Sequence, residues 1–89
     1  MAHITFAPAI QRHVASPARA VDGATVRIAL EAVFALQPEL RGYLLDDQAQ
    51  LRRHLAIFVD GRAIADRQGL GDALRPASRV YVVQALSGG

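Results

Sequence analysis

The chain has 89 residues, 52% of them hydrophobic, and a formal net charge of +2. This length suits a single domain that must be rich in apolar residues, because a domain of this size buries only about 60–65% of the surface that its unfolded chain exposes. The absence of cysteine excludes disulfides, thiolate metal sites and cysteine nucleophiles. All ten basic residues are arginines scattered along the chain. Because a nucleic-acid-binding surface has clustered basic residues, we expect no nucleic-acid partner.

The sequence predicts neither a membrane segment nor a signal peptide. No apolar run approaches the roughly 20 residues that a membrane-spanning helix requires. Residues 1–10 lack a basic stretch followed by a long apolar core. We therefore expect a cytoplasmic protein without a membrane partner.

The amino-terminal part of the chain predicts two strands that form a hairpin. In residues 3–6, Ile4 and Phe6 alternate with polar residues, which is typical of a half-buried strand, and Pro8 ends it. A second, weaker strand is predicted around residues 19–23. The residues between the two strands are expected to form a plain connection.

One main helix is predicted over residues 26–36. Thr25 suits its amino-terminal cap, because a threonine side chain accepts a hydrogen bond from an amide of the first turn. Pro38 ends the helix, since the residue before a proline avoids the helical region. Apolar residues recur at helical spacing at Val26, Ala29, Leu30 and Val33. The helix is apolar nearly all round, so either the segment 38–54 covers a second face or the helix takes part in self-association.

The carboxyl-terminal half predicts a short helical turn, a solvated loop and three strands. The leucines that anchor the turn are Leu40, Leu44 and Leu45. The clearest strand is residues 55–59, which an Asp60-Gly61 hairpin turn joins to a short return strand at 62–65. The last strand is residues 80–85.

Alternation along these strands separates a face toward the helix from an outward face. The residues expected to face the helix are Leu55, Ile57, Val59, Val80 and Val82. Phe58, Tyr81 and Val83 then point outward, where they form either a partner site or ordinary apolar surface. Together the elements predict an α+β fold, with a mixed sheet of four to five strands packed on one main helix.

The strand–strand–helix–strand–strand order, closing with a strand that runs into Gly-Gly, resembles the β-grasp of ubiquitin-like sulfur carriers. These include the small subunit of molybdopterin synthase and the thiamine- and cysteine-pathway carriers. The segments that carry the resemblance are "ITFAPAIQRHV", "GATVRIALEAVFALQPEL", "LRRHLAIFVDGRAI" and "ALSGG". The sequence departs from the molybdopterin carriers in having no proline in "VYVVQA". "LRRHLAIFVDG" looks most like the cysteine-pathway and unassigned molybdopterin-like carriers.

The resemblance implies a ubiquitin-like domain over residues 1–85 and a flexible tail over 86–89. It implies that an E1-like enzyme uses ATP to adenylate the Gly89 carboxylate, and that a sulfur donor converts it to a thiocarboxylate. The sulfur then passes to a cysteine-synthase-like enzyme or to the large subunit of molybdopterin synthase. Leu86, Ser87 and Gly88 complete the tail, in which glycine permits close approach by another backbone. Because the chain has no cysteine, only the carboxyl terminus is left to carry a sulfur.

The resemblance also implies that the outward residues Phe58, Tyr81 and Val83 bind the E1-like partner, since ubiquitin-like proteins meet their activating enzymes through this sheet face. The chain itself is then a carrier and not an enzyme. It binds no cofactor, and the ATP is used by the activating enzyme. The alternative function is a ubiquitin-like interaction module that carries no sulfur and uses only its surface.

No other residues form a pattern for catalysis or metal binding. The histidines are His3, His13 and His54, and they lack the spacing of metal ligands. The acidic residues considered as catalytic pairs are Asp46, Asp47, Asp60 and Asp66. Nothing in the sequence brings such a pair to a cleft, so we interpret these residues as charged loop residues and expect no catalytic residue and no metal site.

Overall fold

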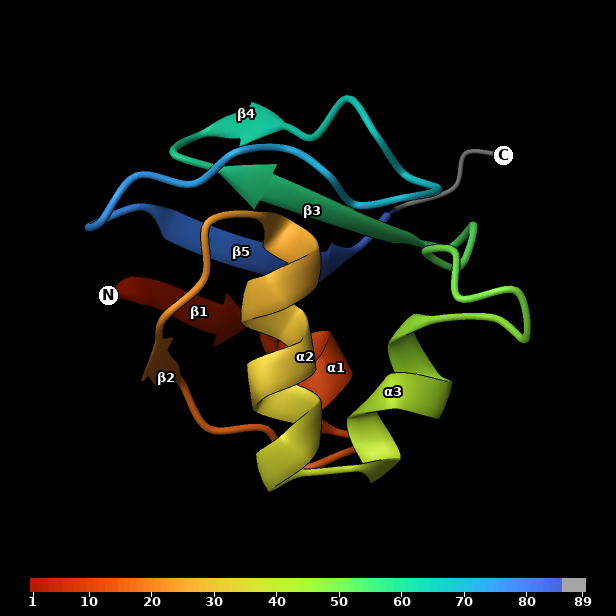
Figure 1. Cartoon of the computed structure of the whole chain (residues 1–89). Helices are drawn as coiled ribbons and strands as arrows, with labels where there is room; N and C mark the ends of the chain where they lie inside the picture. The colour runs from red at the N-terminus through yellow and green to blue at the C-terminus, as the bar shows by residue number, and fades with distance from the viewer. Residues whose placement is uncertain (86–89) are drawn as a thin grey trace.

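The protein folds as one mixed β-sheet with helices packed against it (Figure 1). The computed structural model describes residues 1–85, and the expected tail, residues 86–89, lies outside them. The strands are β1 Ala2–Phe6, β2 Arg19–Val21, β3 Leu55–Val59, β4 Arg62–Ala63 and β5 Arg79–Gln84. They lie in the order β2-β1-β5-β3-β4. The predicted mixed sheet of four to five strands is confirmed.

The pairing of β1 with β5 is parallel, and every other pairing in this sheet is antiparallel. Ala2 of β1 lies opposite Val21 of β2, so the predicted amino-terminal hairpin is confirmed. Parallel neighbours require a long crossover, and the chain between β1 and β5 includes both edge strands and the main helix.

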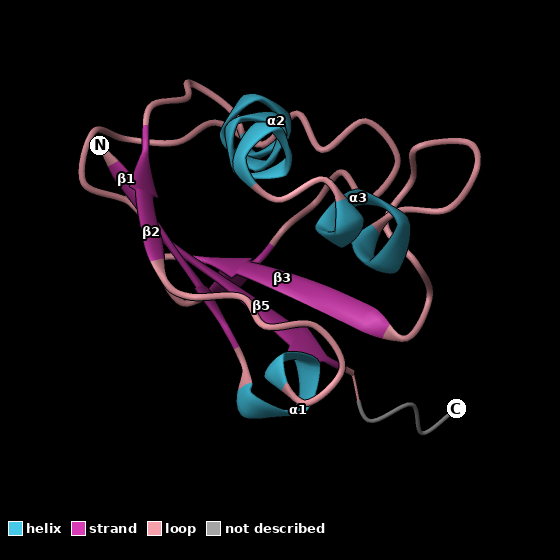
Figure 2. Cartoon of the chain, turned by 90° about the horizontal axis from the view of Figure 1, so that it is seen from below, coloured by secondary structure: helices cyan, strands magenta, loops and turns pink. Residues whose placement is uncertain are grey.

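The main helix α2, Val26–Leu36, has the bounds that the sequence predicts. Thr25 has an extended backbone, and its side-chain oxygen accepts a hydrogen bond from the backbone N–H of Ile28 at 3.2 Å. The helix packs on the sheet through its buried side chains, which are Val26, Ala29, Leu30, Val33 and Phe34. Figure 2 shows α2 and the shorter helix α3, Glu39–Leu44, on the same side of the sheet.

The segment that follows α2 covers part of a second face of this helix. The sequence left two alternatives for this face, cover by segment 38–54 or self-association, and the structure shows the first. The leucines predicted to anchor this segment, Leu40, Leu44 and Leu45, are all buried. The Arg41 guanidinium lies over the Phe34 ring, 5.0 Å from its centroid, and Phe34 is buried. Ile28 and Leu36 of α2 remain exposed.

Two local features test the turn and strand predictions. Asp60 and Gly61 both have positive φ, which is typical of the two-residue hairpin turn predicted there, and Val59 pairs with Arg62 across it. The prediction of a plain connection after β1 is wrong, because Pro8–Gln11 forms the short helix α1. Proline suits the first position of a helix, because a backbone N–H at this position would have no hydrogen-bond partner within the helix.

The cap of α2 gives a first test of the fold. Thr25→Ala removes the acceptor for the Ile28 N–H and should lower the free energy of unfolding by about 1 kcal/mol, measured by urea denaturation. Thr25→Ser keeps the hydroxyl and should retain most of the stability. Equal losses in both variants would show that the cap does not contribute.

Candidate functional site

The sheet-face patch, which we define as Phe58, Tyr81 and Val83, lies on the side of the sheet away from α2. Phe58 of β3 is directly opposite Tyr81 of β5, and Val83 is opposite Ala56 on the same face. The alternate residues of β5, Val80 and Val82, are buried. Tyr81 is 42% exposed, whereas Phe58 and Val83 are half-buried. The patch is therefore a partly exposed apolar surface on two central strands.

The end of β5 forms hydrogen bonds with residues for which the sequence predicts no common role. The backbone N–H of Ala85 donates a hydrogen bond to the His54 carbonyl at 2.8 Å. The Gln84 side-chain amide donates to the Tyr43 hydroxyl at 3.3 Å. The chain is thus bonded to two other segments at Gln84 and Ala85, the last two residues that the structure describes.

Tyr43 itself lies between two histidines. The His13 ring stacks on it with 5.8 Å between centroids, and the His54 ring meets its edge at 6.3 Å. These residues come from the loop after α1, from α3 and from the loop before β3. No signal in the sequence joins them, because they are far apart along the chain. The candidate tail residues Leu86, Ser87, Gly88 and Gly89 lie outside the described residues.

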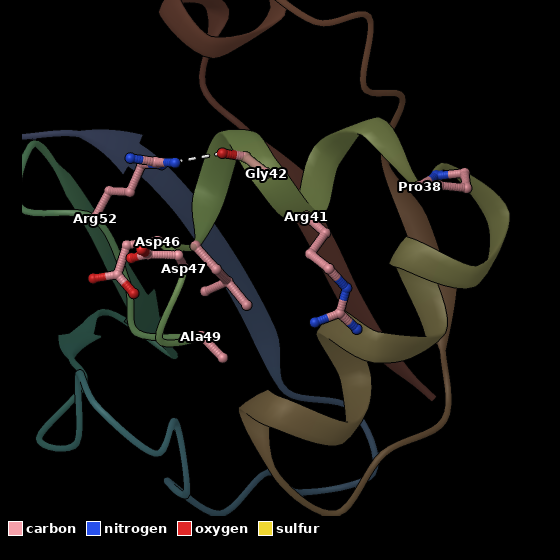
Figure 3. A pocket seen from close by; sticks show the side chains of 8 residues that line it. Pro38, Arg41, Gly42, Asp46, Asp47, Ala49 and Arg52 are labelled. Carbon is pink, nitrogen blue, oxygen red and sulfur yellow. Dashed lines mark hydrogen bonds between the residues drawn. The ribbon is translucent and has the colours of Figure 1, made fainter.

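A surface hollow of about 490 Å³ lies between α3 and the loop that follows it. Three of its charged side chains, Arg41, Asp46 and Arg52, already have partners within the protein. The Asp46 carboxylate accepts hydrogen bonds from the backbone N–H groups of Gln48 and Gln50 at 2.9 and 3.0 Å. Figure 3 shows the Arg52 guanidinium at the Gly42 carbonyl, to which its Nε donates at 3.1 Å. We therefore do not assign a ligand site to this hollow.

Asp60, one of the acidic residues considered for catalysis, bonds the β3–β4 turn to the start of β5. Its carboxylate accepts hydrogen bonds from the backbone N–H of Arg79 and from the Ser78 hydroxyl, both at 2.9 Å. The Arg79 bond, followed by the Ser78 bond, lowers the pKa of the Asp60 carboxyl from its ordinary value. A carboxylate with a lowered pKa remains charged near neutral pH, which suits a structural acceptor better than a general acid or base.

Asp66 has the same kind of role in the loop before β5. It accepts hydrogen bonds from the backbone N–H groups of Gly69 and Gly71 at 2.8 and 3.1 Å, and these bonds lower the pKa of its carboxyl. Within residues 1–85 the structure gathers no group of three or more histidines or carboxylates that could hold a metal ion. In the same part of the chain, no helix has the length and apolar character needed to cross a membrane.

Comparison with known proteins decides the family. The ThiS family model matches residues 8–89. The chain belongs to the ThiS family. The predicted membership among ubiquitin-like sulfur carriers is therefore confirmed. A comparison with curated proteins found no match.

Solved structures of the same fold are similar to this ThiS-family chain over its whole length. SAMP1 from Haloferax volcanii has 26% sequence identity and a TM-score of 0.76, with 99% of this chain and 98% of that one covered. CysO in the BexX/CysO complex of Amycolatopsis orientalis has 17% identity and a TM-score of 0.82, with both chains covered completely. CysO from Mycobacterium tuberculosis has 17% identity and a TM-score of 0.81, with 97% and 100% covered. The two likenesses to CysO show the β-grasp fold and nothing further.

The turn held by Asp60 gives a pH-dependent prediction. Because its pKa in the folded state is lowered, the charged carboxylate stabilises the fold at pH values above its ordinary pKa, and this stabilisation is lost as the pH falls through the folded-state pKa. Asp60→Asn tolerates the positive φ but loses the charge, so it should lower Tm near neutral pH.

The difference in Tm between Asp60→Asn and the wild-type chain should shrink as the pH is lowered below about 4. Asp47→Asn, a change at an exposed loop residue, is the control and should leave Tm nearly unchanged. A difference for Asp60→Asn that stays constant down to low pH would contradict the role of the charge.

Proposed function

We propose that this protein carries sulfur as a thiocarboxylate on the carboxyl group of Gly89. The observation that carries the proposal is a chain of the ThiS family that ends in Gly88-Gly89 and contains no cysteine. With no thiol side chain available, the terminal carboxylate is left as the group to which a sulfur can be attached covalently.

The chemistry requires partner enzymes. A carboxylate is a poor electrophile at neutral pH, so an E1-like enzyme first transfers AMP to it from ATP and releases pyrophosphate. Sulfide then attacks the acyl carbon, the bond to AMP breaks so that AMP and the sulfide proton are released, and the thiocarboxylate remains. In this scheme the chain is a co-substrate rather than an enzyme, and ATP binds to the activating enzyme.

The sheet-face patch is the proposed docking surface for that E1-like enzyme. It combines a partly exposed tyrosine with a phenylalanine and a valine on adjacent strands, and aromatic anchors of this kind contribute much of the binding energy at protein interfaces. Strand β5 carries two members of the patch and leads directly to the tail. A partner bound to the patch would therefore lie beside the end of β5, after which the tail follows in the sequence.

The sulfur acceptor is a cysteine-synthase-like enzyme or a molybdopterin-synthase large subunit. A CysO protein of the same fold forms a complex with BexX, which supports a protein partner of this kind for the present chain. The second candidate function, an interaction module without sulfur chemistry, is favoured by the same exposed patch. The two functions differ in whether the diglycine is needed.

Intact-protein mass spectrometry tests the carrier function. After incubation with ATP, an E1-like enzyme and sulfide, the wild-type chain should gain the mass that corresponds to exchange of one oxygen for sulfur. A chain lacking Gly88-Gly89 should gain none, whereas Ser87→Ala, which keeps the diglycine, should react as the wild type does. Full function of the shortened chain in its biological setting would instead favour the interaction module.

The docking surface is tested by the double variant Phe58→Ala/Tyr81→Ala. It should raise the KM of adenylation for the carrier by about tenfold with little change in kcat, because it removes binding that is equal in the ground state and the transition state. The matched control is Ile28→Ala/Leu36→Ala, which removes two exposed apolar side chains from α2 on the other side of the sheet. Unchanged adenylation kinetics in the sheet-face variant would refute the docking surface.

A further inference from the structure

A polar hollow lies beside the sheet-face patch, on the same outer face of the sheet. It has a volume of about 260 Å³ and is lined by His3 and Thr5 of β1 and by Arg79 of β5. All three residues are exposed. The hollow has room for a carboxyl group together with a few water molecules, each of which occupies about 30 Å³.

The register of the parallel pair β1–β5 forms this hollow. His3 lies opposite Arg79 and Thr5 lies opposite Tyr81, while the residues that alternate with them in both strands are buried. The hollow therefore adjoins the patch at Tyr81, and both belong to one continuous face. A partner that covers Tyr81 would also meet the three residues of the hollow.

Each side chain of the hollow has a group that donates hydrogen bonds: an imidazole, a hydroxyl and a guanidinium. Within residues 1–85 the ion pairs join Glu31 to Arg27 and Arg41, so the Arg79 guanidinium is not neutralised by an ion pair in that part of the chain. The neighbouring carboxylate, that of Asp60, is instead bonded to the Ser78 hydroxyl and to the Arg79 backbone N–H.

The rest of the outer face adds no negative charge. Across the described strands, from β2 to β4, the outward positions hold no aspartate or glutamate. A guanidinium on such a face matches a carboxylate in both charge and geometry, because its planar fork can donate two parallel hydrogen bonds to the two oxygens. The face thus combines an apolar half with a cationic half.

We infer that the hollow formed by His3, Thr5 and Arg79 receives an aspartate or glutamate side chain of the protein that docks on the sheet-face patch. The inference rests on the proposed function, in which that protein is the adenylating enzyme. The apolar patch provides most of the affinity, whereas the charged contact fixes the orientation of the sheet on the partner. A fixed orientation directs the end of β5 toward the active site.

The test compares two arginine variants in the adenylation assay with the wild-type enzyme pair. Arg79→Gln should raise KM for the carrier about five- to tenfold and leave kcat unchanged, and Arg79→Lys, which keeps the charge but not the fork, should lie between it and the wild type. Arg62→Gln is the matched control: it removes the same charge from β4 at a position opposite Val59, off the outer face, and should change KM less than twofold.

Ionic strength provides a readout that a loss of folding would not reproduce. Raising the salt concentration to about 0.15 M should increase KM for the wild type and for Arg62→Gln, and the increase should be clearly smaller for Arg79→Gln, because the charged contact is already missing. Equal KM values for Arg79→Gln and Arg62→Gln, with an active wild type, would overturn the inference and leave the carrier function intact. Failure of the wild type to be adenylated would overturn both.

Discussion

The parallel pairing of β1 with β5 is the contact on which the rest of the molecule depends. It joins the first strand of the chain to the last and forms the middle of the sheet, with the two hairpins on either side. On the inner face it aligns Ile4 with Val80 and Phe6 with Val82, and all four are buried in the core. On the outer face the same register aligns His3 with Arg79. One pairing therefore sets both the core and the proposed docking face.

Much of this arrangement could be predicted from the sequence because it depends on short-range periodicity. The bounds of α2 follow from its apolar spacing between Thr25 and Pro38, and the β3–β4 turn follows from Asp60-Gly61. The outward direction of the sheet-face patch follows from alternation alone, since neighbouring residues of a strand lie on opposite faces. The order of the strands and their directions do not follow from any local pattern.

The parts that could not be predicted are short or assembled from distant segments. Helix α1 has four residues, with only Ile10 buried, so it is too short to show a helical period. The position of Tyr43, with the His13 ring stacked on it and the His54 ring at its edge, depends on how the loop after α1, helix α3 and the loop before β3 meet. The hollow beside Tyr81 likewise requires the β1–β5 register, which becomes visible only in the folded chain.

The register of β5 also links stability to the proposed function. A shift of one residue would turn Tyr81 inward and expose Val80 and Val82, because the side chains of a strand alternate with a period of two. The same shift would move the Ala85 N–H away from the His54 carbonyl, where the chain leaves the sheet. The apolar core therefore fixes the position of the proposed docking face relative to Ala85, the last residue that the structure describes. In the proposed function, a partner that binds this face therefore finds the end of β5 at a fixed position. It does not need to contact Ala85 itself.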